Sequence, residues 1–213
     1  MLNQNQISEI FSILAVTIET PKTELNYTNN FTLLLAVVLS SQAKDVSVNL
    51  ATQKLFQIIQ EPQDIIKLGE IELIKHIKSI GLYKNKAKHI MLLAQNLISN
   101  FNSQVPEDFD QLVSLPGVGR KTANVVLNEA FGHETIGVDT HVFRVSKRLG
   151  LSEANTVEGV ESDLLQKVPK FHKYKAHHLL ILHGRYICKM RKPQCEICKI
   201  SHLCKFYLNE LIR

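Results

Sequence analysis

Four cysteines near the C-terminal end of the sequence are the first residues that indicate a chemistry. The chain has 213 residues and only four cysteines, all between positions 188 and 204 with the spacing C-x6-C-x2-C-x5-C. Four thiolates in so short a segment need a cation to neutralise and organise them, which zinc or an iron–sulfur cluster would supply. Disulfides are the alternative, and we disfavour them because we expect an intracellular protein, whose thiols stay reduced. The candidate metal ligands are Cys188, Cys195, Cys198 and Cys204.

The cysteine segment is also strongly basic, with a single acid, Glu196, among its cations. These cations could offset the negative charge of thiolates around a metal, or they could face outward to phosphate. A solvated, lysine-rich loop is the third possibility. The whole chain has a net charge of +5 and an isoelectric point near 9.0, which suits a polyanionic partner without establishing one. The cations are Lys189, Arg191, Lys192, Lys199 and Lys205.

A glycine-rich turn between two expected helices is the second candidate site. Residues 115–119 read Leu-Pro-Gly-Val-Gly, and glycine lets a backbone turn tightly and approach another molecule closely. The amides of Gly117, Val118 and Gly119 could point outward at a helix N-terminus, which suits a phosphate oxygen. Such contacts would position a DNA duplex without reading its sequence. A Gly-x-Gly turn is also common at ordinary helix corners, so the turn alone does not establish binding.

Two cations, Arg120 and Lys121, open the helix after this turn, where the helix dipole disfavours positive charge. Sequences break such local rules most often at functional sites. The same field favours the uncharged amine that a lysine nucleophile requires, although a solvent-facing lysine is the plain alternative. Asp139 precedes a later apolar helical pattern, where it could cap the helix and keep its carboxylate ionised.

The elements that must position these residues are expected to be helices throughout, so we predict an all-α fold. Apolar residues recur at helical spacing, and no alternating strand pattern or internal repeat is visible. The longest apolar run, residues 31–39, is too short to span a bilayer, and the first residues lack the pattern of a secretion signal. We expect helices over residues 7–18, 31–39, 46–56, 70–80, 87–101, 109–114, 140–149, 156–168 and 174–186, a short one from residue 62 and one that ends at residue 131.

In their order and intervals, these residues resemble the endonuclease III family of DNA-repair glycosylases, in the helix-hairpin-helix superfamily. The match runs through nearly the whole chain. Each short string is only suggestive, whereas their joint presence is specific. The matching strings are residues 39–43 (LSSQA), 80–83 (IGLY), 115–123 (LPGVGRKTA), 138–141 (VDTH) and 182–186 (LHGRY).

The resemblance implies a fold and a metal. The family folds as two helical domains with a cleft between them. One expected domain, residues 22–132, is a helical barrel with the helix-hairpin-helix motif, and the other joins residues 1–21 to residues 133–213. The cysteine spacing is similar to that of the family's [4Fe–4S] cluster, so the resemblance assigns iron–sulfur rather than zinc to the four cysteines.

The resemblance also implies a reaction. The family contains bifunctional DNA glycosylases and AP lyases of base excision repair, which remove oxidised pyrimidines and cut 3′ to the abasic site by β-elimination. Lys121 would form the Schiff base, with Asp139 as its carboxylate partner. Gln42 and Leu82 would enter the vacated base stack as a polar filler and an apolar wedge. The hairpin would contact double-stranded DNA through Gly117, Val118, Gly119 and Arg120.

One departure and three alternatives stand beside this interpretation. The family commonly has threonine where this chain has Lys44, so the preferred damaged base stays open. The alternatives are a non-catalytic DNA-binding module, an adenine-mismatch glycosylase, and a thymine or uracil mismatch glycosylase without lyase activity. Lys121 disfavours all three. We expect a monomer that acts on DNA in the cytoplasm or nucleoid, without a membrane partner.

Overall fold

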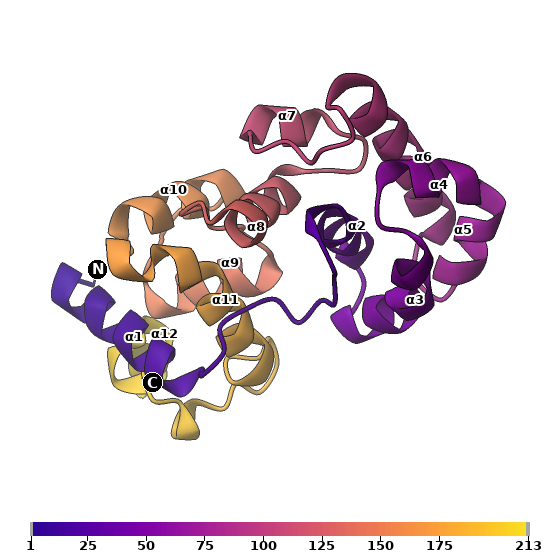
Figure 1. The fold of residues 1–213 in the computed structure, drawn as a ribbon. Coiled ribbons are helices and arrows are strands. Elements are labelled where there is room, and N and C mark those ends of the chain that lie inside the picture. The colour runs from indigo at the N-terminus through magenta and orange to yellow at the C-terminus, as the bar shows by residue number, and fades with distance from the viewer. Residues whose placement is uncertain (1, 212–213) are drawn as a thin grey trace. The chain divides into compact units, whose positions relative to one another are not determined.

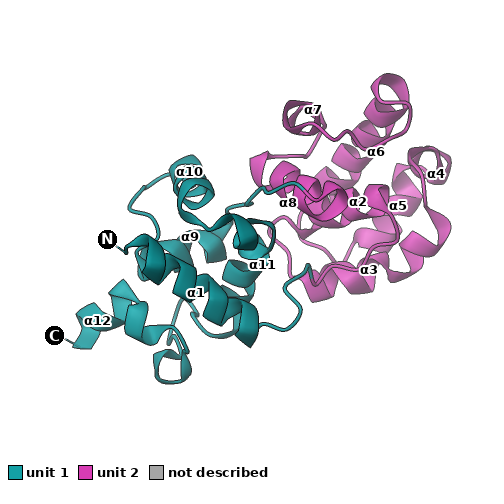
Figure 2. Ribbon diagram, turned by 60° about the vertical axis from the view of Figure 1, so that its left-hand side comes forward, with its two compact units in different colours: residues 1–23, 133–213 teal, residues 24–132 magenta. Residues whose placement is uncertain are grey.

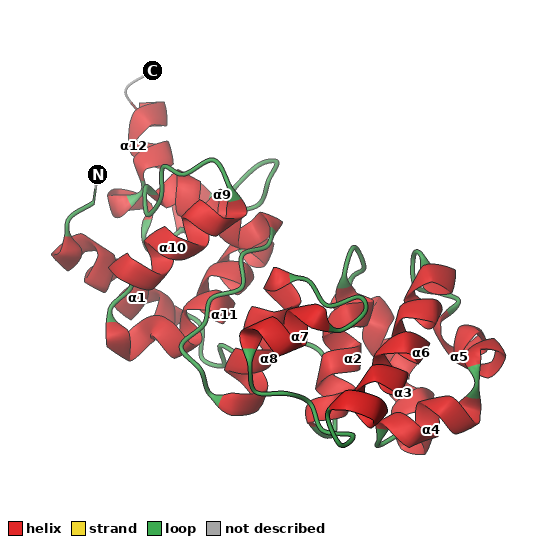
Figure 3. Cartoon of the chain, turned by 90° about the horizontal axis from the view of Figure 1, so that it is seen from above, coloured by secondary structure: helices red, strands yellow, loops and turns green. Residues whose placement is uncertain are grey.

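All the regular structure of the chain is helical. The computed structural model describes residues 2–211, and this part of the chain contains helices and loops but no strand (Figure 1, Figure 3). The predicted all-α fold is therefore confirmed. The helices are α1 (Gln4–Thr17), α2 (Asn30–Ser40), α3 (Asp45–Ile58), α4 (Pro62–Leu68), α5 (Glu70–Ile77), α6 (Tyr83–Asn100), α7 (Phe109–Ser114), α8 (Arg120–Phe131), α9 (Thr140–Leu149), α10 (Val157–Lys167), α11 (Lys170–Tyr186), the 3-10 helices η1 (Cys195–Ile197) and η2 (Ser201–Leu203), and α12 (Lys205–Leu211).

The chain divides into two compact units, which Figure 2 shows in different colours. Unit 2 is the continuous segment Glu24–Gly132, whereas unit 1 combines the chain up to Thr23 with the chain from His133 onward. Each unit has its own apolar core. The glycine-rich turn lies in unit 2, and the cysteine segment lies in unit 1.

Helix α2 is central to the core of unit 2. Every residue from Phe31 to Leu39 is buried, and α2 packs against α3, α6 and α8. A helix that is surrounded on all sides can be apolar on every face, which explains the unbroken apolar run in the sequence. At its N-terminus the Asn29 side chain accepts from the Thr32 amide at 2.9 Å, and the Thr32 hydroxyl accepts from the Asn29 amide at 2.9 Å. Helix α2 is therefore fixed by packing on all sides, and it holds the start of the turn that follows it.

Helices α9 and α11 form the centre of unit 1. They pack on each other, with α1 against α11 and both α10 and α12 against α9. Four buried histidines lie on α11. The His177 ring lies 2.7 Å from the carbonyl oxygen of Gly137 through Nδ1, and the His172 ring stacks on Phe11 with its centroid 6.2 Å away. These histidines thus fill the core of the unit as packed side chains.

Helix α3 forms where the apolar spacing of Val46, Leu50, Leu55 and Phe56 predicted it, and Leu55 and Phe56 are buried as expected, whereas the other two are not. Val46 and Leu50, which marked this helix in the sequence, are 69% and 70% exposed. Thr52 is buried instead, and its hydroxyl donates to the carbonyl oxygen of Val48 at 2.9 Å. Because that bond satisfies the hydroxyl, a polar residue is stable on the core face of the helix. The predicted apolar face was wrong at Val46 and Leu50.

Two further differences concern the C-terminal half of the chain. Helix α11 begins at Lys170, before the predicted start. The prediction missed this first turn because the turn shows no apolar period and its Phe171 is exposed. Helix α12 was not predicted. Within residues 2–211, no helix combines the length and the apolar character that a membrane span needs.

Candidate active site and metal centre

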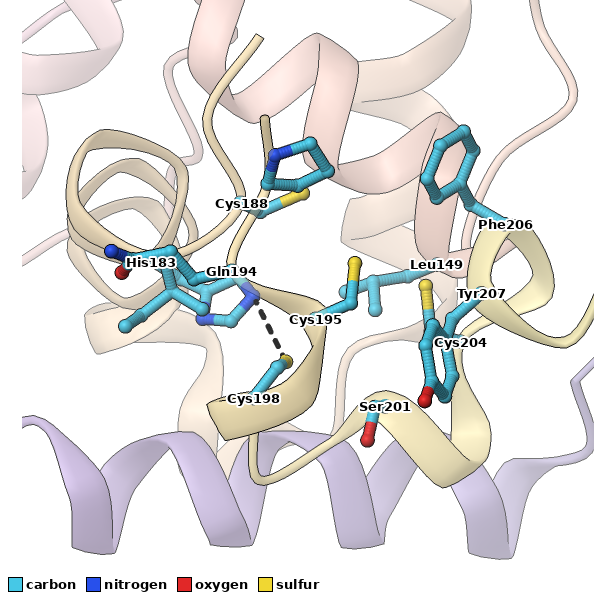
Figure 4. A pocket seen from close by; sticks show the side chains of 12 residues that line it. Leu149, His183, Cys188, Gln194, Cys195, Cys198, Ser201, Cys204, Phe206 and Tyr207 are labelled. Carbon is cyan, nitrogen blue, oxygen red and sulfur yellow. Dashed lines mark hydrogen bonds between the residues drawn. The ribbon is translucent and has the colours of Figure 1, made fainter. Parts of the chain in front are cut away.

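The four cysteines come together around one cavity in unit 1 (Figure 4). All four are free, and tight turns bring them there: the Cys198 amide donates to the Cys195 oxygen at 3.2 Å, and the Cys204 amide donates to the Ser201 oxygen at 3.0 Å. Within residues 2–211, no three His, Cys, Asp or Glu side chains form a group that could hold a single metal ion. The four thiols therefore share one cavity without forming a closed site for a single ion in the described part of the chain.

Burial sets the charge of the groups around this cavity. It raises the pKa of the Cys195, Cys198 and Cys204 thiols, so the neutral thiol is favoured until a metal cation stabilises the thiolate. Burial also lowers the pKa of His183 to about 4, so its imidazole is neutral at pH 7. The His183 Nε2 lies 3.8 Å from the Cys198 sulfur (Figure 4). Burial thus favours the neutral form of these groups, and a bound metal cation would favour the thiolates instead.

Two arginines of α9 hold the main chain of the cysteine segment. Arg144 donates to the carbonyl oxygen of Cys188 from Nε at 3.1 Å and from Nη2 at 3.0 Å. Arg148 donates to the carbonyl oxygens of Lys189 and Met190 at 2.7 and 3.0 Å, and its Nη1 lies 3.5 Å from the Cys188 sulfur. Sequence reasoning missed both arginines, because about forty positions separate them from their partners.

The basic side chains within the cysteine segment do not face the sulfur atoms. All five of the cations that the sequence singled out are exposed, and Lys205 pairs with Glu153 at 3.0 Å. The cation that approaches a cysteine sulfur is Arg148, which comes from α9. Apart from Lys205, these exposed cations are therefore accessible to a polyanion.

The glycine-rich turn joins α7 to α8 in unit 2. Gly117 has φ +80°, and a Cβ there would lie 3.0 Å from the Cβ of His89, so the turn packs closely on α6. Gly119 is the N-cap of α8, and nothing lies within 4 Å of the place of its Cβ. The Val118 amide donates to the Leu115 oxygen at 3.1 Å. The expectation of an outward-facing amide is therefore wrong for Val118, whereas Gly117 and Gly119 are exposed.

Arg120 and Lys121 occupy the first turn of α8, which has no side-chain cap at its N-terminus. The Arg120 guanidinium lies over the Phe109 ring, 4.9 Å from its centroid. Lys121 is partly buried, and the residues that follow it, Thr122 and Ala123, are buried in the core. The backbone that carries Lys121 is thus fixed by core packing, and Lys121 does not lie on a loop.

Asp139 is the N-cap of α9 in unit 1. Its Oδ1 accepts from the amides of His141 and Val142, both at 2.8 Å, which confirms the predicted capping role. Both bonds use the same oxygen, so Oδ2 accepts no hydrogen bond from the described residues, 2–211. The carboxylate is therefore fixed in orientation and retains one oxygen for another partner. Lys121 belongs to unit 2 and Asp139 to unit 1, and each stands at the start of a helix.

Gln42 and Leu82 lie in loops of unit 2, as predicted, and both are exposed. Leu82 is 57% exposed, so the alternative that it is tucked into the core is wrong. Both residues have left-handed backbone, with φ of 54° and 62°. This conformation is uncommon for residues other than glycine, and such strain clusters at functional sites. The positive φ at these two positions could not be predicted from the sequence, because glutamine and leucine rarely adopt it.

Comparison with known proteins decides the family. Residues 35–170 match the model of the HhH-GPD superfamily of base excision DNA repair proteins. The chain belongs to this family. Endonuclease III of Rickettsia felis is 56% identical to this HhH-GPD protein over 206 residues, which cover 97% of each chain. Endonuclease III of Escherichia coli K12 is 49% identical over 205 residues, which cover 96% of this chain and 97% of the relative.

Solved structures agree with this result. A trapped covalent intermediate of endonuclease III with DNA matches the HhH-GPD protein with a TM-score of 0.93 and 45% sequence identity, over 99% of this chain and 100% of that chain. The protein is thus a DNA glycosylase and AP lyase of base excision repair. The prediction of an enzyme is confirmed, which sets the non-catalytic binding module aside.

The two glycines of the hairpin give a matched pair of stability predictions. We expect Gly117→Ala to lower the free energy of unfolding by about 1–3 kcal/mol, because alanine is strained at positive φ and its Cβ would press on His89. Gly119→Ala should cost less than about 1 kcal/mol, since its φ is −97° and its surroundings are open. Urea unfolding followed by circular dichroism measures both. Equal costs would contradict the described hairpin.

Proposed function

We propose that this glycosylase and lyase removes oxidised pyrimidines from double-stranded DNA, with Lys121 as nucleophile and Asp139 as its carboxylate partner. The observation that carries the proposal is the place of Lys121 on the first turn of α8, directly after the hairpin turn. Gly117 and Gly119 of that turn are exposed, and their amides would suit a DNA phosphate. A bound backbone would therefore lie beside the amine. The free Oδ2 of Asp139 supports the second assignment.

The reaction breaks two bonds of the damaged nucleotide. The neutral amine of Lys121 attacks C1′ of the sugar, and the C1′–N bond breaks as the base leaves with its electron pair and takes up a proton. The sugar ring then opens as the C1′–O4′ bond breaks and O4′ takes up a proton, which leaves a protonated Schiff base between Lys121 and C1′. Removal of a C2′ proton then expels the 3′ oxygen and cuts the strand, and water hydrolyses the imine. Asp139 accepts the amine proton and stabilises positive charge on the sugar.

The DNA must open before Lys121 can reach the sugar, because C1′ and the damaged base are otherwise held in the stack. We assign Gln42 and Leu82 to the vacated space, since both are exposed on strained loops. Gly117, Gly119 and Arg120 would contact phosphates, while the internal bond of Val118 keeps the hairpin in shape. We further propose that the protein acts as a monomer where it meets chromosomal DNA, in the cytoplasm or nucleoid.

The cysteine cavity fits a [4Fe–4S] cluster. All four ligands would be thiolates, from Cys188, Cys195, Cys198 and Cys204, which is a donor set that such clusters use. Two observations support the fit: all four thiols line the same cavity, and burial raises the pKa of Cys195, Cys198 and Cys204, so a bound cation would be needed to stabilise their thiolates. When bound, the cluster would supply the iron cations that cross-link the segment. The protein's own contribution is the Arg144 and Arg148 contacts that hold the main chain.

The lysine assignment predicts a covalent adduct. Borohydride should trap the wild-type protein on DNA that carries an oxidised pyrimidine or an abasic site, and Lys121→Ala should give no adduct because the amine is gone. Gel electrophoresis after reduction detects the adduct, and fluorescence anisotropy should show that Lys121→Ala still binds. Lys54→Ala, which removes an exposed lysine from α3, is the charge-matched control and should trap normally. An adduct that persists in Lys121→Ala would identify another nucleophile.

The cluster assignment predicts a colour. Protein prepared without oxygen should be brown and contain iron, and Cys198→Ser should lose both the visible absorbance and the iron. Ser201→Ala is the control, because Ser201 lines the same cavity and carries no thiol. Metal analysis and absorbance spectra report the outcome. A colourless wild-type protein that contains zinc would contradict the assignment of iron.

Lys44 predicts opposite effects on stability and DNA binding. It is the N-cap of α3, is exposed and makes no side-chain cap bond. Lys44→Thr should supply a cap and raise the free energy of unfolding by about 1 kcal/mol. It should also weaken DNA binding and reduce the slope of log affinity against log salt by about 1, if the ammonium neutralises one phosphate. Thermal melts measure the expected gain in stability, and salt titrations measure the expected loss of DNA affinity. An unchanged salt slope would show that Lys44 makes no phosphate contact.

A further inference from the structure

One buried lysine connects the two exposed, strained residues of unit 2. Gln42 follows the C-terminal end of α2, and Leu82 immediately precedes α6. Both have positive φ, and left-handed backbone at such residues persists only where the surrounding structure holds it. Lys86 lies on the first turns of α6 and is only 6% exposed. It contacts the main chain of both segments.

Lys86 makes two hydrogen bonds, one from its side chain and one from its backbone amide. Its Nζ donates to the carbonyl oxygen of Leu39 at 2.9 Å, near the last turn of α2. Its own amide donates to the carbonyl oxygen of Leu82 at 3.0 Å, which is the first hydrogen bond of α6. The turn after α2 is closed by the Ala43 amide, which donates to the Ser40 oxygen at 3.0 Å. The Lys86 side chain thus ties the start of α6, which directly follows Leu82, to the last turn of α2, which precedes Gln42.

The ammonium of Lys86 is in an unusual environment. Burial lowers its pKa below the ordinary lysine value, because the charged form loses water. The C-terminal end of α2 offsets part of that cost, since the carbonyl end of a helix carries partial negative charge. A buried charge gains little stability over an apolar residue of similar size. Stability alone is therefore a weak reason for an ammonium at this position, whereas fixing the place of two loops is a direct use of it.

We propose that Lys86 is a positioning residue for base extrusion, which holds the Gln42 loop and the Leu82 loop in a fixed arrangement. Leu82 can then enter the base stack while Gln42 fills the space that the damaged base leaves. Lys86 itself is buried and touches neither the DNA nor the reacting atoms. The inference rests on the roles proposed above for Gln42 and Leu82.

The experiment compares two substrates that differ in how much base extrusion they require. Lys86→Met keeps the length of the side chain and removes the charge, and Lys54→Met is the charge-matched control on the surface of α3. We expect Lys86→Met to slow single-turnover excision of an oxidised pyrimidine by between about tenfold and 100-fold. Cleavage at a pre-formed abasic site should change far less, because no damaged base remains to be extruded. A 2-aminopurine opposite the lesion should also show a smaller rise in fluorescence.

A mutant cycle separates positioning from a general loss of structure. In a Gln42→Ala and Leu82→Ala background, Lys86→Met should cause no further loss of excision, because the side chains through which it acts are absent. Melting curves establish that each variant is folded, and Lys86→Gln replaces Lys86→Met in the cycle if the latter is unfolded. Equal losses on both substrates, no loss on either, or a full additional loss in the double-mutant background would each overturn the proposal. A wild-type protein that excises nothing would instead overturn the proposed function.

Discussion

The first amides of a helix have no partner within the helix, and this constraint recurs at the candidate site residues Leu82, Gly119, Arg120, Lys121 and Asp139. Asn3, Asn29, Asp108 and Thr156 close the starts of α1, α2, α7 and α10 with side-chain bonds. Helices α3, α6 and α8 have no such bond and begin instead behind Lys44, Leu82 and Gly119. An uncapped helix start offers donors and positive potential to an anion. In unit 2, every helix start to which we assign a DNA contact is therefore one that lacks a side-chain cap.

Asp139 shows how a capping residue can serve two purposes. The cap uses only Oδ1, and both of its bonds are short. That geometry fixes the orientation of the carboxylate. A base or electrostatic partner in catalysis needs the same fixed orientation, so the capping role and the catalytic role of this residue are compatible. Lys121 has the complementary arrangement, in which the backbone is fixed by Thr122 and Ala123 in the core while the amine lies on the first turn.

The fold was largely predictable because its elements depend on local patterns. Apolar spacing located the helices up to α11, and the type of residue before one such pattern identified Asp139 as the cap of α9. The failures have local causes too: Thr52 satisfies its own hydroxyl on the core face of α3, and the first turn of α11 has no apolar period. The site residues that sequence reasoning missed depend on distant partners. Arg148 reaches Met190 and Lys86 reaches Leu39, and no short-range pattern announces either contact.

The arginine contacts of α9 have a consequence for how the metal centre is assembled. Arg144 and Arg148 bind main-chain oxygens of the cysteine segment, so much of their hold does not depend on the sulfur atoms. Without the proposed cluster, the main chain at Cys188 would remain anchored to α9. The cysteine segment would therefore be partly ordered before the proposed cluster binds. Ordering its ligands would then cost less entropy than it does in a small zinc finger, which is unfolded without its ion.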